Sequence, residues 1–372
     1  MSPNKNTQQP NSPTIAPEFD SVEMFLAGIN AAGYARYNYG KLLSREGQFK
    51  EMIPGAADVA LLNSGAAAMH TAIEAEGLST GDIILCSTAM YGTSKARLDA
   101  LGRYGIRVEK FDPADMGSLK QVAASMRPKL IIVESVANTK EMPLIDIAAL
   151  AVIAEESGAS LIIDNTLPSP HLLNPLQMLK GTKASHVIVE SGTKHYQDGK
   201  NEITLGLAYS SDLAKIQEIK RKRIDMGTYL QPGDEARIPS TIAETMPATM
   251  KNHARNGLVL AKALQSLPGF VVAHPNLQSH PQHDLANTLA PDGIATLFYV
   301  TIPEGDTGAA FMQRIKNAGE DQIGLGSSFG HPKTWLSNYQ LDERTVRIAV
   351  GSESEREFDQ VVKLFQDHAL KK

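Results

Sequence analysis

The chain has 372 residues, which exceeds the usual size of one hydrophobic core, so we expect two domains. Hydrophobic residues make up 42%, as in ordinary globular proteins, and the net charge of -5 argues against nucleic acid or an acidic membrane as a partner. No apolar stretch of the sequence approaches the ~20 residues that a membrane-spanning helix needs.

The N-terminal segment and the single cysteine favour a cytoplasmic protein without a metal site. The segment MSPNKNTQQPNSPT is polar and lacks the apolar core of a signal peptide, so we expect a disordered tail. Cys86 alone can form neither an intrachain disulfide nor a Cys-rich metal site. It lies in an apolar run, where we expect it to be a small buried side chain.

Four short apolar runs between residues 83 and 191 share one form. They are IILCST (83–88), LIIVES (130–135), LIIDNT (161–166) and HVIVES (186–191). Continuous runs rich in β-branched residues are typical of strands buried on both faces, as in a parallel sheet covered by helices. Intervening segments such as 117–126 and 145–158 are predicted to be helices, the second with Gly158 as its C-cap. This alternation predicts a doubly wound α/β domain.

Each apolar run turns polar where it ends. In doubly wound sheets, ligands bind beyond the carboxyl ends of the strands. The polar residues at those ends therefore either line a binding site or simply begin loops. A basic run at 220–223 is interpreted as the solvated face of a helix.

The character of the sequence changes after about Pro239. Residues 249–267 have the pattern of a long amphipathic helix, and 275–284 that of a loop. The segments 293–302 and 344–351 alternate like strands with one solvated face, and a terminal helix follows. We expect a smaller α+β domain here.

The segment Asn63–Met69 joins an apolar run to a predicted helix through small residues. A helix that begins at Ser64, Gly65 and Ala66 would expose unpaired N–H groups and the positive end of its dipole, both of which favour a phosphate. A plain Ser N-cap is the alternative.

Lys194 follows the last apolar run directly, with hydroxyls on Ser191 and Thr193 beside it. A desolvated lysine has a lowered pKa and becomes a nucleophile toward carbonyls. The alternative is a surface lysine that begins a loop. Asp164, at the end of another run, needs a partner: either a protonated pyridine nitrogen or a structural cation.

These segments occur in an order that resembles the Cys/Met-metabolism family of pyridoxal-phosphate (PLP) enzymes, which includes cystathionine γ-synthase, cystathionine lyases, methionine γ-lyase and homoserine sulfhydrylases. The resemblance covers residue 34 to the C-terminus, and implies the fold type I, PLP-dependent transferase-like architecture. The matching pieces are YAR (34–36), NSGAAAMHTAI (63–73), YGTS (91–94), ESVAN (134–138), IIDNTLPSPHLLNPL (162–176), ESGTKHY (190–196), HPQHDLA (280–286) and VRIAVGSE (346–353).

The resemblance implies a role for each matched position around the cofactor PLP. Lys194 would carry PLP as a Schiff base and later move protons, and Asp164 would pair with the pyridine nitrogen. Tyr91 would stack on the ring and act as an acid or base near the leaving group. Asn138 would bind the 3′-oxygen or the substrate carboxylate. The phosphate would be held by Ser191, Thr193, Ser64 and the N–H groups of Gly65 and Ala66.

The resemblance further implies a shared site and a carboxylate clamp. Tyr34, also a catalytic group, and Arg36 would reach the phosphate site of a neighbouring subunit. Arg347 would bind the substrate α-carboxylate through its bidentate guanidinium. Where the family has Ser-Leu-Gly near that carboxylate, this chain has Gly324-Leu325-Gly326, so Ser327 is expected to supply the hydroxyl.

Other departures from the family pattern mark a divergent member. The sequence after Arg36 lacks the family's Pro-Thr, and His195 is interpreted as a local variation rather than a catalytic group. The departures cluster around the substrate and the subunit interface, which suggests an unusual substrate.

We expect a PLP-dependent lyase that performs γ-elimination on a sulfur-containing or related small amino acid, giving a 2-oxo acid and ammonia. The alternatives are γ-replacement, as in an O-acylhomoserine sulfhydrylase or cystathionine γ-synthase, then a β-lyase or a γ-lyase for a substrate without sulfur. A non-catalytic PLP-fold protein would require loss of the lysine or the arginine, and both are present.

The shared site implies a homo-oligomer, with a dimer as the smallest active unit and a dimer of dimers as the expected assembly. The predicted division has three parts. These are a tail and arm over 1–40, a PLP-binding α/β domain over 41–245, and an α+β domain over 246–372.

Overall fold

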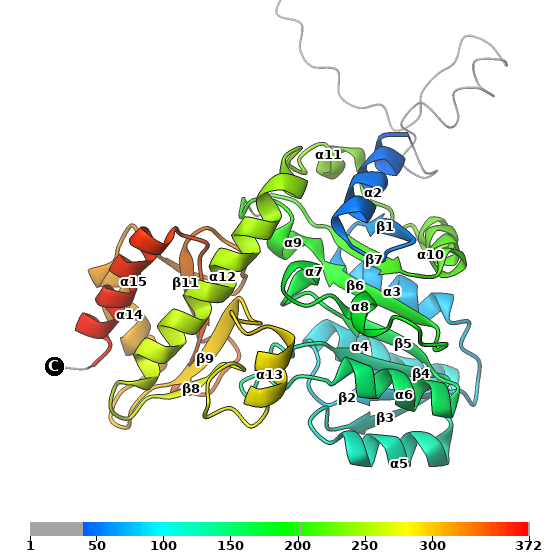
Figure 1. Ribbon diagram of the computed structural model, residues 1–372, viewed down its shortest axis with the longest axis horizontal. Helices are drawn as coiled ribbons and strands as arrows, with labels where there is room; N and C mark the ends of the chain where they lie inside the picture. The colour runs from blue at the N-terminus through cyan, green and yellow to red at the C-terminus, as the bar shows by residue number, and fades with distance from the viewer. Residues whose placement is uncertain (1–39, 201, 371–372) are drawn as a thin grey trace, which may run out of the picture.

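The computed structural model describes residues 40–200 and 202–370, which form two β-sheets with helices packed around them (Figure 1). The larger sheet has the strand order β1-β7-β6-β5-β4-β2-β3. β2 to β6 run parallel, whereas β7 is antiparallel to both β1 and β6. The strands are β1 (Asp58–Leu62), β2 (Ile83–Ser87), β3 (Arg107–Phe111), β4 (Leu130–Glu134), β5 (Ser160–Asp164), β6 (His186–Ser191) and β7 (Gly206–Ser210).

Helices cover both faces of this sheet. On β4, Ile131 and Val133 join the apolar cluster that contains helix α6, while Leu130 and Ile132 join the cluster that contains α3 and α10. Alternate residues of one strand thus meet helices on opposite sides, which explains why the strands are apolar at every position. The helices are α2 (Gly40–Met52), α3 (Gly65–Ala75), α4 (Gly92–Leu101), α5 (Met116–Met126), α6 (Ile147–Ser157), α7 (Ser169–Leu172), α8 (Pro175–Met178), α9 (Gly192–His195), α10 (Leu213–Met226) and α11 (Pro232–Glu235), with a short 3-10 turn at Gly102–Tyr104.

The smaller sheet has the order β10-β11-β12-β9-β8 and is antiparallel except between β10 and β11. In Figure 1 the long helix α12 runs from the side of α11 across this sheet, and it packs against α15 and α7. The elements are α12 (Ile242–Gln265), β8 (Val271–Ala273), α13 (His283–Leu289), β9 (Leu297–Thr301), α14 (Gly308–Ala318), β10 (Ile323–Leu325), β11 (Thr334–Ser337), β12 (Thr345–Ala349) and α15 (Glu355–His368).

The mostly parallel sheet and the separate C-terminal sheet confirm the predicted fold class. The four apolar runs form β2, β4, β5 and β6, and Cys86 is buried in β2 with 2% of its surface exposed. Helix α12 begins at Ile242, seven residues before the predicted start, although Pro247 lies inside it. The proline lacks one helical N–H, which is why the sequence pattern indicated a later start. The predicted boundary at residue 245 falls inside this helix, and the division into domains stays a prediction.

The basic run 220–223 was predicted to be a solvated helix face, and this is wrong for Arg223, which is buried. Arg223 is fully buried, and it donates to the Glu46 carboxylate and, over 2.7 Å, to the carbonyl of Leu61. Lys220 Nζ lies 2.7 Å from a carboxylate oxygen of Asp58. Because α10 packs against β1, part of its basic face points into the protein and is neutralised there.

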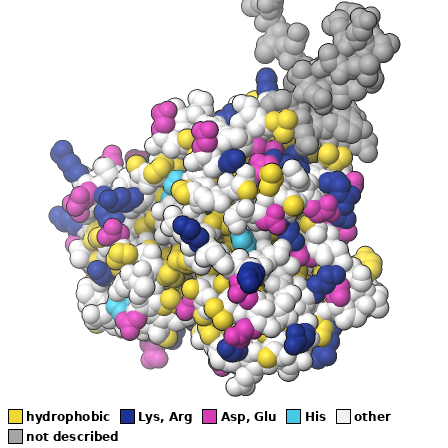
Figure 2. All heavy atoms as spheres, turned by 45° about the vertical axis from the view of Figure 1, so that its right-hand side comes forward, with side chains coloured by type: hydrophobic (Ala, Val, Ile, Leu, Met, Phe, Trp, Pro, Cys, Tyr) yellow, Lys and Arg dark blue, Asp and Glu magenta, His cyan; other side chains and the backbone are white. Residues whose placement is uncertain are grey.

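Acidic and basic side chains are interspersed over the face of the molecule in Figure 2, without a large area of one sign. None of the helices in the described ranges 40–200 and 202–370 is long and apolar enough to cross a membrane.

Candidate active site

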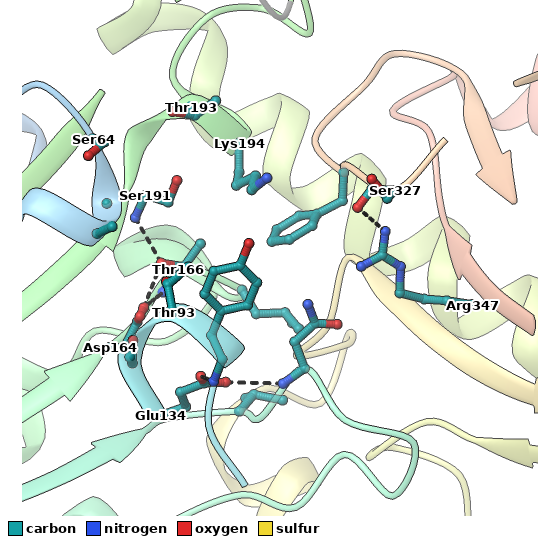
Figure 3. A pocket seen from close by; sticks show the side chains of 18 residues that line it. Ser64, Thr93, Glu134, Asp164, Thr166, Ser191, Thr193, Lys194, Ser327 and Arg347 are labelled. Atoms are coloured by element: carbon teal, nitrogen blue, oxygen red, sulfur yellow. Dashed lines mark hydrogen bonds between the residues drawn. The ribbon is translucent and has the colours of Figure 1, made fainter. Parts of the chain in front are cut away.

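A cavity of about 260 Å³ lies beyond the carboxyl ends of β4, β5 and β6, where the smaller sheet faces the larger one (Figure 3). The N-termini of α3 and α4 form one side, and the side chains that follow β10 and those of β12 form the other. The lining residues are Ser64, Gly65, Ala66, Tyr91, Thr93, Ser94, Glu134, Val136, Asn138, Asp164, Thr166, Leu167, Ser191, Thr193, Lys194, Ser327, Phe329 and Arg347.

The N-terminus of α3 presents free backbone donors to this cavity. Ser64 caps the helix, with its Oγ accepting from Ala67 N over 3.1 Å. Gly65 must be a glycine, because a Cβ there would lie 2.6 Å from the Cβ of Ser191. This close approach brings the first turn of α3 against the end of β6. The N–H groups of Gly65 and Ala66 make no helical hydrogen bond, as expected of a first turn, and are available to an anion.

Lys194 lies in the one-turn helix α9 directly after β6. Its Nζ donates to Ser328 Oγ over 3.2 Å and lies 5.2 Å from the centre of the Phe329 ring. Gly330 packs on the lysine backbone so tightly that a Cβ would lie 1.9 Å from the Lys194 carbonyl oxygen. Burial, followed by the positive charge of Arg347, lowers the pKa of Lys194. The lysine is therefore fixed by its surroundings and poised to lose its proton.

Asp164 ends β5 with its carboxyl group buried in the cavity. Thr166 donates to Asp164 Oδ1 from its backbone nitrogen over 3.0 Å and from its hydroxyl over 2.5 Å. The same hydroxyl accepts from Ser191 N over 2.8 Å, which ties the ends of β5 and β6 together. Burial raises the pKa of Asp164 despite the two hydrogen bonds from Thr166. A positive ligand group beside this carboxyl would reverse that shift.

Glu134 is a second buried acid, one strand away on β4. It accepts from Tyr91 N over 2.5 Å and from Asn138 N over 3.2 Å, so it holds the backbone of two predicted site residues. Burial, and then the negative charge of Asp164, raises the pKa of Glu134 to about 8. No role was predicted for this residue, although its position at the polar end of an apolar run was the available signal.

Arg347 projects from β12 on the opposite side of the cavity (Figure 3). One of its terminal nitrogens donates to the carbonyls of Ser327 and, over 3.4 Å, Ser328. Its Nε is buried without a hydrogen-bond partner in the described part of the chain. The guanidinium is thus held at one corner and retains donors for a ligand.

The charges of the cavity are separated in space and unpaired. Figure 3 shows Asp164 and Glu134 on one side and Arg347 across from them, with Lys194 pointing in between. Among residues 40–200 and 202–370, none of these four side chains takes part in an ion pair. Buried charges are normally paired, so the arrangement suits a ligand with a positive group at one end and a carboxylate at the other.

The cavity brings together nearly all of the residues that the sequence singled out. They are Ser64, Gly65, Ala66, Tyr91, Asn138, Asp164, Ser191, Thr193, Lys194, Ser327 and Arg347. Tyr34 and Arg36 lie outside the described residues. Ser327 lines the cavity and offers its carbonyl to Arg347, while the hydroxyl beside Lys194 belongs to Ser328. The role of the Ser327 hydroxyl near the substrate carboxylate stays a prediction.

Three of the residues discussed from the sequence have a local environment that the sequence did not reveal. Thr193 Oγ1 accepts from Leu205 N over 3.0 Å, so its hydroxyl is partly engaged by the neighbouring chain. Tyr91 is 57% exposed, so only part of its side chain is covered by the described residues. His195 is buried and its Nε2 lies 3.3 Å from the carbonyl of Leu167.

Fold and cavity together define a fold type I enzyme that uses PLP, with a reactive lysine after a strand and an acid at the end of its neighbour. The family model described as Cys/Met metabolism PLP-dependent enzyme matches residues 19–358. The chain belongs to this family, and its cofactor is PLP.

Relatives and solved structures agree with this assignment. The chain is 31% identical to an L-methionine gamma-lyase of Pseudomonas putida over 86% of this chain and 81% of that enzyme. It is 30% identical to an O-succinylhomoserine sulfhydrylase of Pseudomonas aeruginosa over 72% of this chain and 64% of that enzyme. The same fold occurs in a cystathionine gamma synthase from Xanthomonas oryzae, with a TM-score of 0.80 at 21% identity over 97% of this chain and 94% of that one. The structure of an assigned O-acetylhomoserine (thiol)-lyase from Campylobacter jejuni, which contains a pyridoxyl-lysine adduct, has a TM-score of 0.78 at 21% identity over 96% and 94%.

Proposed function

We propose that this enzyme catalyses γ-elimination from a sulfur-containing or related amino acid, with one water consumed and a thiol, a 2-oxo acid and ammonia as products. The observation that carries the proposal is the separation of unpaired charges in one cavity, with Asp164 and Glu134 at one end, Arg347 at the other and Lys194 between them. A cationic ring nitrogen fits beside the acids, and an amino-acid carboxylate fits beside the arginine.

The residues of the cavity fit PLP. Asp164 would hold the ring nitrogen, which supplies the positive partner that this buried acid lacks in the described chain. The free N–H groups of Gly65 and Ala66 would bind the phosphate, together with Ser191, Thr193 and Ser64. Lys194 would form the covalent link, since its lowered pKa favours the neutral amine.

When bound, PLP supplies an electron-withdrawing ring that makes the hydrogen on the substrate Cα acidic. Arg347 would bind the α-carboxylate and orient the amino acid toward Lys194. Lys194 Nζ would then take the proton from Cα, pass it on to the cofactor and so regain its free electron pair, and, for γ-elimination, take a proton from Cβ. The Phe329 ring, whose centre lies 5.2 Å from Nζ, covers one side of this amine. Tyr91 would give a proton to the departing sulfur.

γ-Replacement is the second candidate, because the relatives include a sulfhydrylase and a cystathionine gamma-synthase as well as methionine and cystathionine gamma-lyases. The two reactions share every step up to the loss of the γ-substituent. They differ in whether water or an added thiol completes the reaction. The predicted β-lyase and sulfur-free substrates remain further alternatives.

A substrate panel tests the proposal. Purified holoenzyme would be incubated with methionine, homocysteine, cystathionine, cysteine, O-acetylhomoserine, O-succinylhomoserine and canavanine, each with and without a thiol. We expect a four-carbon 2-oxo acid from a γ-substituted substrate without thiol. If substrate is consumed only when a thiol is present, the proposed reaction is wrong and the enzyme performs γ-replacement. If the panel yields only pyruvate from cysteine, the enzyme is a β-lyase.

The predicted homo-oligomer belongs to the same proposal. Arg36→Ala should weaken PLP binding without lowering the melting temperature of the apoenzyme, if Tyr34 and Arg36 complete a neighbour's phosphate site. Equilibrium dialysis of PLP measures this, and unchanged affinity would remove the argument for a shared site. The dimer of dimers and the cytoplasmic location stay predictions from the sequence.

A further inference from the structure

Tyr299 lies directly behind the wall of the site, next to the lining residues Arg347 and Asn138, and no role has been given to it. It is on β9 directly opposite Arg347 of β12 in the antiparallel register. Residues directly opposite each other in such a pair project from the same face of the sheet. Its side chain is 5% exposed, and it also lines a second cleft between the two sheets. The tyrosine therefore stands beside the arginine and separates the cavity from that cleft.

The hydroxyl of Tyr299 connects the two sheets. It donates to Asn138 Oδ1 over 2.9 Å, in the segment that follows β4 of the larger sheet. It also lies 3.3 Å from the carbonyl oxygen of Asn138. On the other side, Tyr299 lies opposite Arg347, whose positive charge partly offsets the rise that burial causes in the pKa of the hydroxyl. The guanidinium has only donors, so it can face only the lone pairs of the tyrosine oxygen, whose single hydrogen is directed at Asn138.

The protonation state supports this assignment of donor and acceptor. Burial raises the pKa of Tyr299 to about 12, although the nearby Arg347 acts in the opposite direction. The hydroxyl therefore keeps its hydrogen at neutral pH. With Oδ1 of Asn138 occupied by that hydrogen, the amide nitrogen has no partner in the described part of the chain and is available to a ligand oxygen.

We propose that Tyr299 is a positioning residue for the substrate carboxylate, which it serves by aligning Arg347 from one sheet with Asn138 from the other. This inference rests on the proposed function, in which Arg347 binds the α-carboxylate. A free guanidinium can adopt many rotamers, and a carboxylate needs two of its nitrogens in one plane. The Ser327 carbonyl, which accepts a hydrogen bond from Arg347, and the cross-strand neighbour Tyr299 flank the guanidinium and restrict it before the substrate arrives.

The test compares two ligands that differ only in the carboxylate. L-Norleucine has no leaving group, and n-pentylamine is the same molecule without its carboxylate. Their binding to holoenzyme would be followed through the absorbance of the cofactor. Tyr299→Phe should weaken the binding of norleucine about tenfold, as expected when the hydroxyl that holds Asn138 and faces Arg347 is lost, and leave the binding of pentylamine unchanged. Equal affinities for norleucine in variant and wild type, or an equal loss for both ligands, would overturn the proposal.

Two further variants separate positioning from a general structural effect. Tyr104→Phe makes the same chemical change at a tyrosine that is 64% exposed, and it should alter neither ligand's affinity. Tyr299→Met also lacks the hydroxyl and adapts to the available space, so it must show the same selective loss even if Tyr299→Phe folds poorly. Melting temperatures check the folded state of each variant.

A double-mutant cycle locates the effect at the arginine. In an Arg347→Ala background, Tyr299→Phe should no longer change the affinity for norleucine, because the group that it positions is absent. A full tenfold loss in that background would overturn the proposal. The outcome is distinct from that of the substrate panel, because norleucine binding reports on the carboxylate site whichever reaction the enzyme performs. Failure of norleucine to bind wild-type holoenzyme would contradict the proposed function itself.

Discussion

The cluster around Glu46 and the active-site cavity both bury charged side chains, but they treat them in opposite ways. Glu46 and Arg223 are fully buried side by side, and Glu46 Oε1 also accepts from Leu61 N over 2.9 Å. Lys220 Nζ stands 2.9 Å from Glu46 Oε2 as an ion pair rather than an aligned hydrogen bond. In the cavity, Asp164 and Lys194 have no ion-pair partner among the described residues.

The difference between paired and unpaired buried charges indicates which part of this protein needs a ligand to neutralise its charges. Removing charges from water is costly, and the cluster around Glu46 offsets that cost within the chain itself. In the cavity, no ion pair among the described residues offsets the cost of removing these charges from water. Burial therefore raises the pKa of Asp164 and lowers that of Lys194. A charge without a partner is thus a mark of function here, and a charge with a partner is a mark of structure.

The largest expected effect is on catalysis. Lys194→Ala should lower turnover by at least about 10³-fold, because none of the other described residues that line the cavity carries an amine that could form the covalent link or move the Cα proton. Stopped assays of 2-oxo acid release measure it, on whichever substrate the panel identifies. Lys180→Ala, at an exposed lysine, is the matched control and should keep wild-type turnover. If Lys194→Ala keeps its activity, Lys194 is not a catalytic residue and its buried charge has a structural role.

The second prediction concerns the paired charges. Glu46→Gln should lower the free energy of unfolding by about 3–5 kcal/mol, because it leaves Arg223 buried without its carboxylate. Urea denaturation measures this, and kcat/KM of the folded fraction should not change. Glu51→Gln alters an exposed acid of the same helix and is expected to stay within about 0.5 kcal/mol of wild type. A loss of activity without a loss of stability would contradict the structural role of Glu46.

A third class of buried group stays neutral, and pH distinguishes it from the other two. His253 is fully buried, with Nδ1 donating to the Val350 carbonyl over 2.6 Å, and burial lowers its pKa to about 4. In the unfolded chain its pKa is about 6.5, so the unfolded state binds the proton first as pH falls. The contribution of His253 to stability is therefore full above pH ~6.5 and is lost progressively as pH falls toward about 4.

The loss amounts to about 3 kcal/mol over that interval. Other groups titrate in the same range, so the quantity to measure is the difference in unfolding free energy between wild type and His253→Leu. This difference should shrink as pH is lowered from 7 to 4. A difference that stays constant would mean that His253 is protonated in the folded protein too.

The smallest expected effect is a gain in stability rather than a loss. Asp164→Asn should stabilise the apoenzyme by about 1 kcal/mol, because it removes a buried charge that has no ion-pair partner in the described chain. The same change should weaken PLP binding, so the stabilisation that PLP gives to the wild type becomes smaller. Melting curves with and without PLP measure both effects. If Asp164→Asn destabilises the apoenzyme, Asp164 has a structural role like that of Glu46 and its charge is already compensated without a ligand.

Much of the site followed from local patterns in the sequence. Lys194 and Asp164 stood at the polar ends of apolar runs, and parallel strands bring such ends to one edge of a sheet. Gly65 and Ala66 followed a strand and began a helix, which indicated a phosphate site. These signals needed no knowledge of distant contacts, because each depends on residues a few positions apart.

Glu134, Ser328 and Tyr299 escaped prediction for a different reason. Glu134 was visible only as the end of a strand, and its bonds to Tyr91 and Asn138 depend on how the following segments fold back over it. Ser328 meets Lys194, which depends on the path of the backbone after β10. Nothing near Tyr299 in the sequence indicated a site, because its partners lie 48 and 161 positions away.

The sequence by itself determined the elements of this protein, its cofactor and its family, because strand and helix periodicity and short motifs are local properties. The tertiary structure decided which buried charges are paired. Arg223, which the sequence placed on a solvated face, meets Glu46 inside the protein, whereas the amine of Lys194 meets, among the described residues, the Ser328 hydroxyl and the Phe329 ring. That distinction depends on contacts between segments far apart in the chain, and it separates the charges that hold the fold from those that await a ligand.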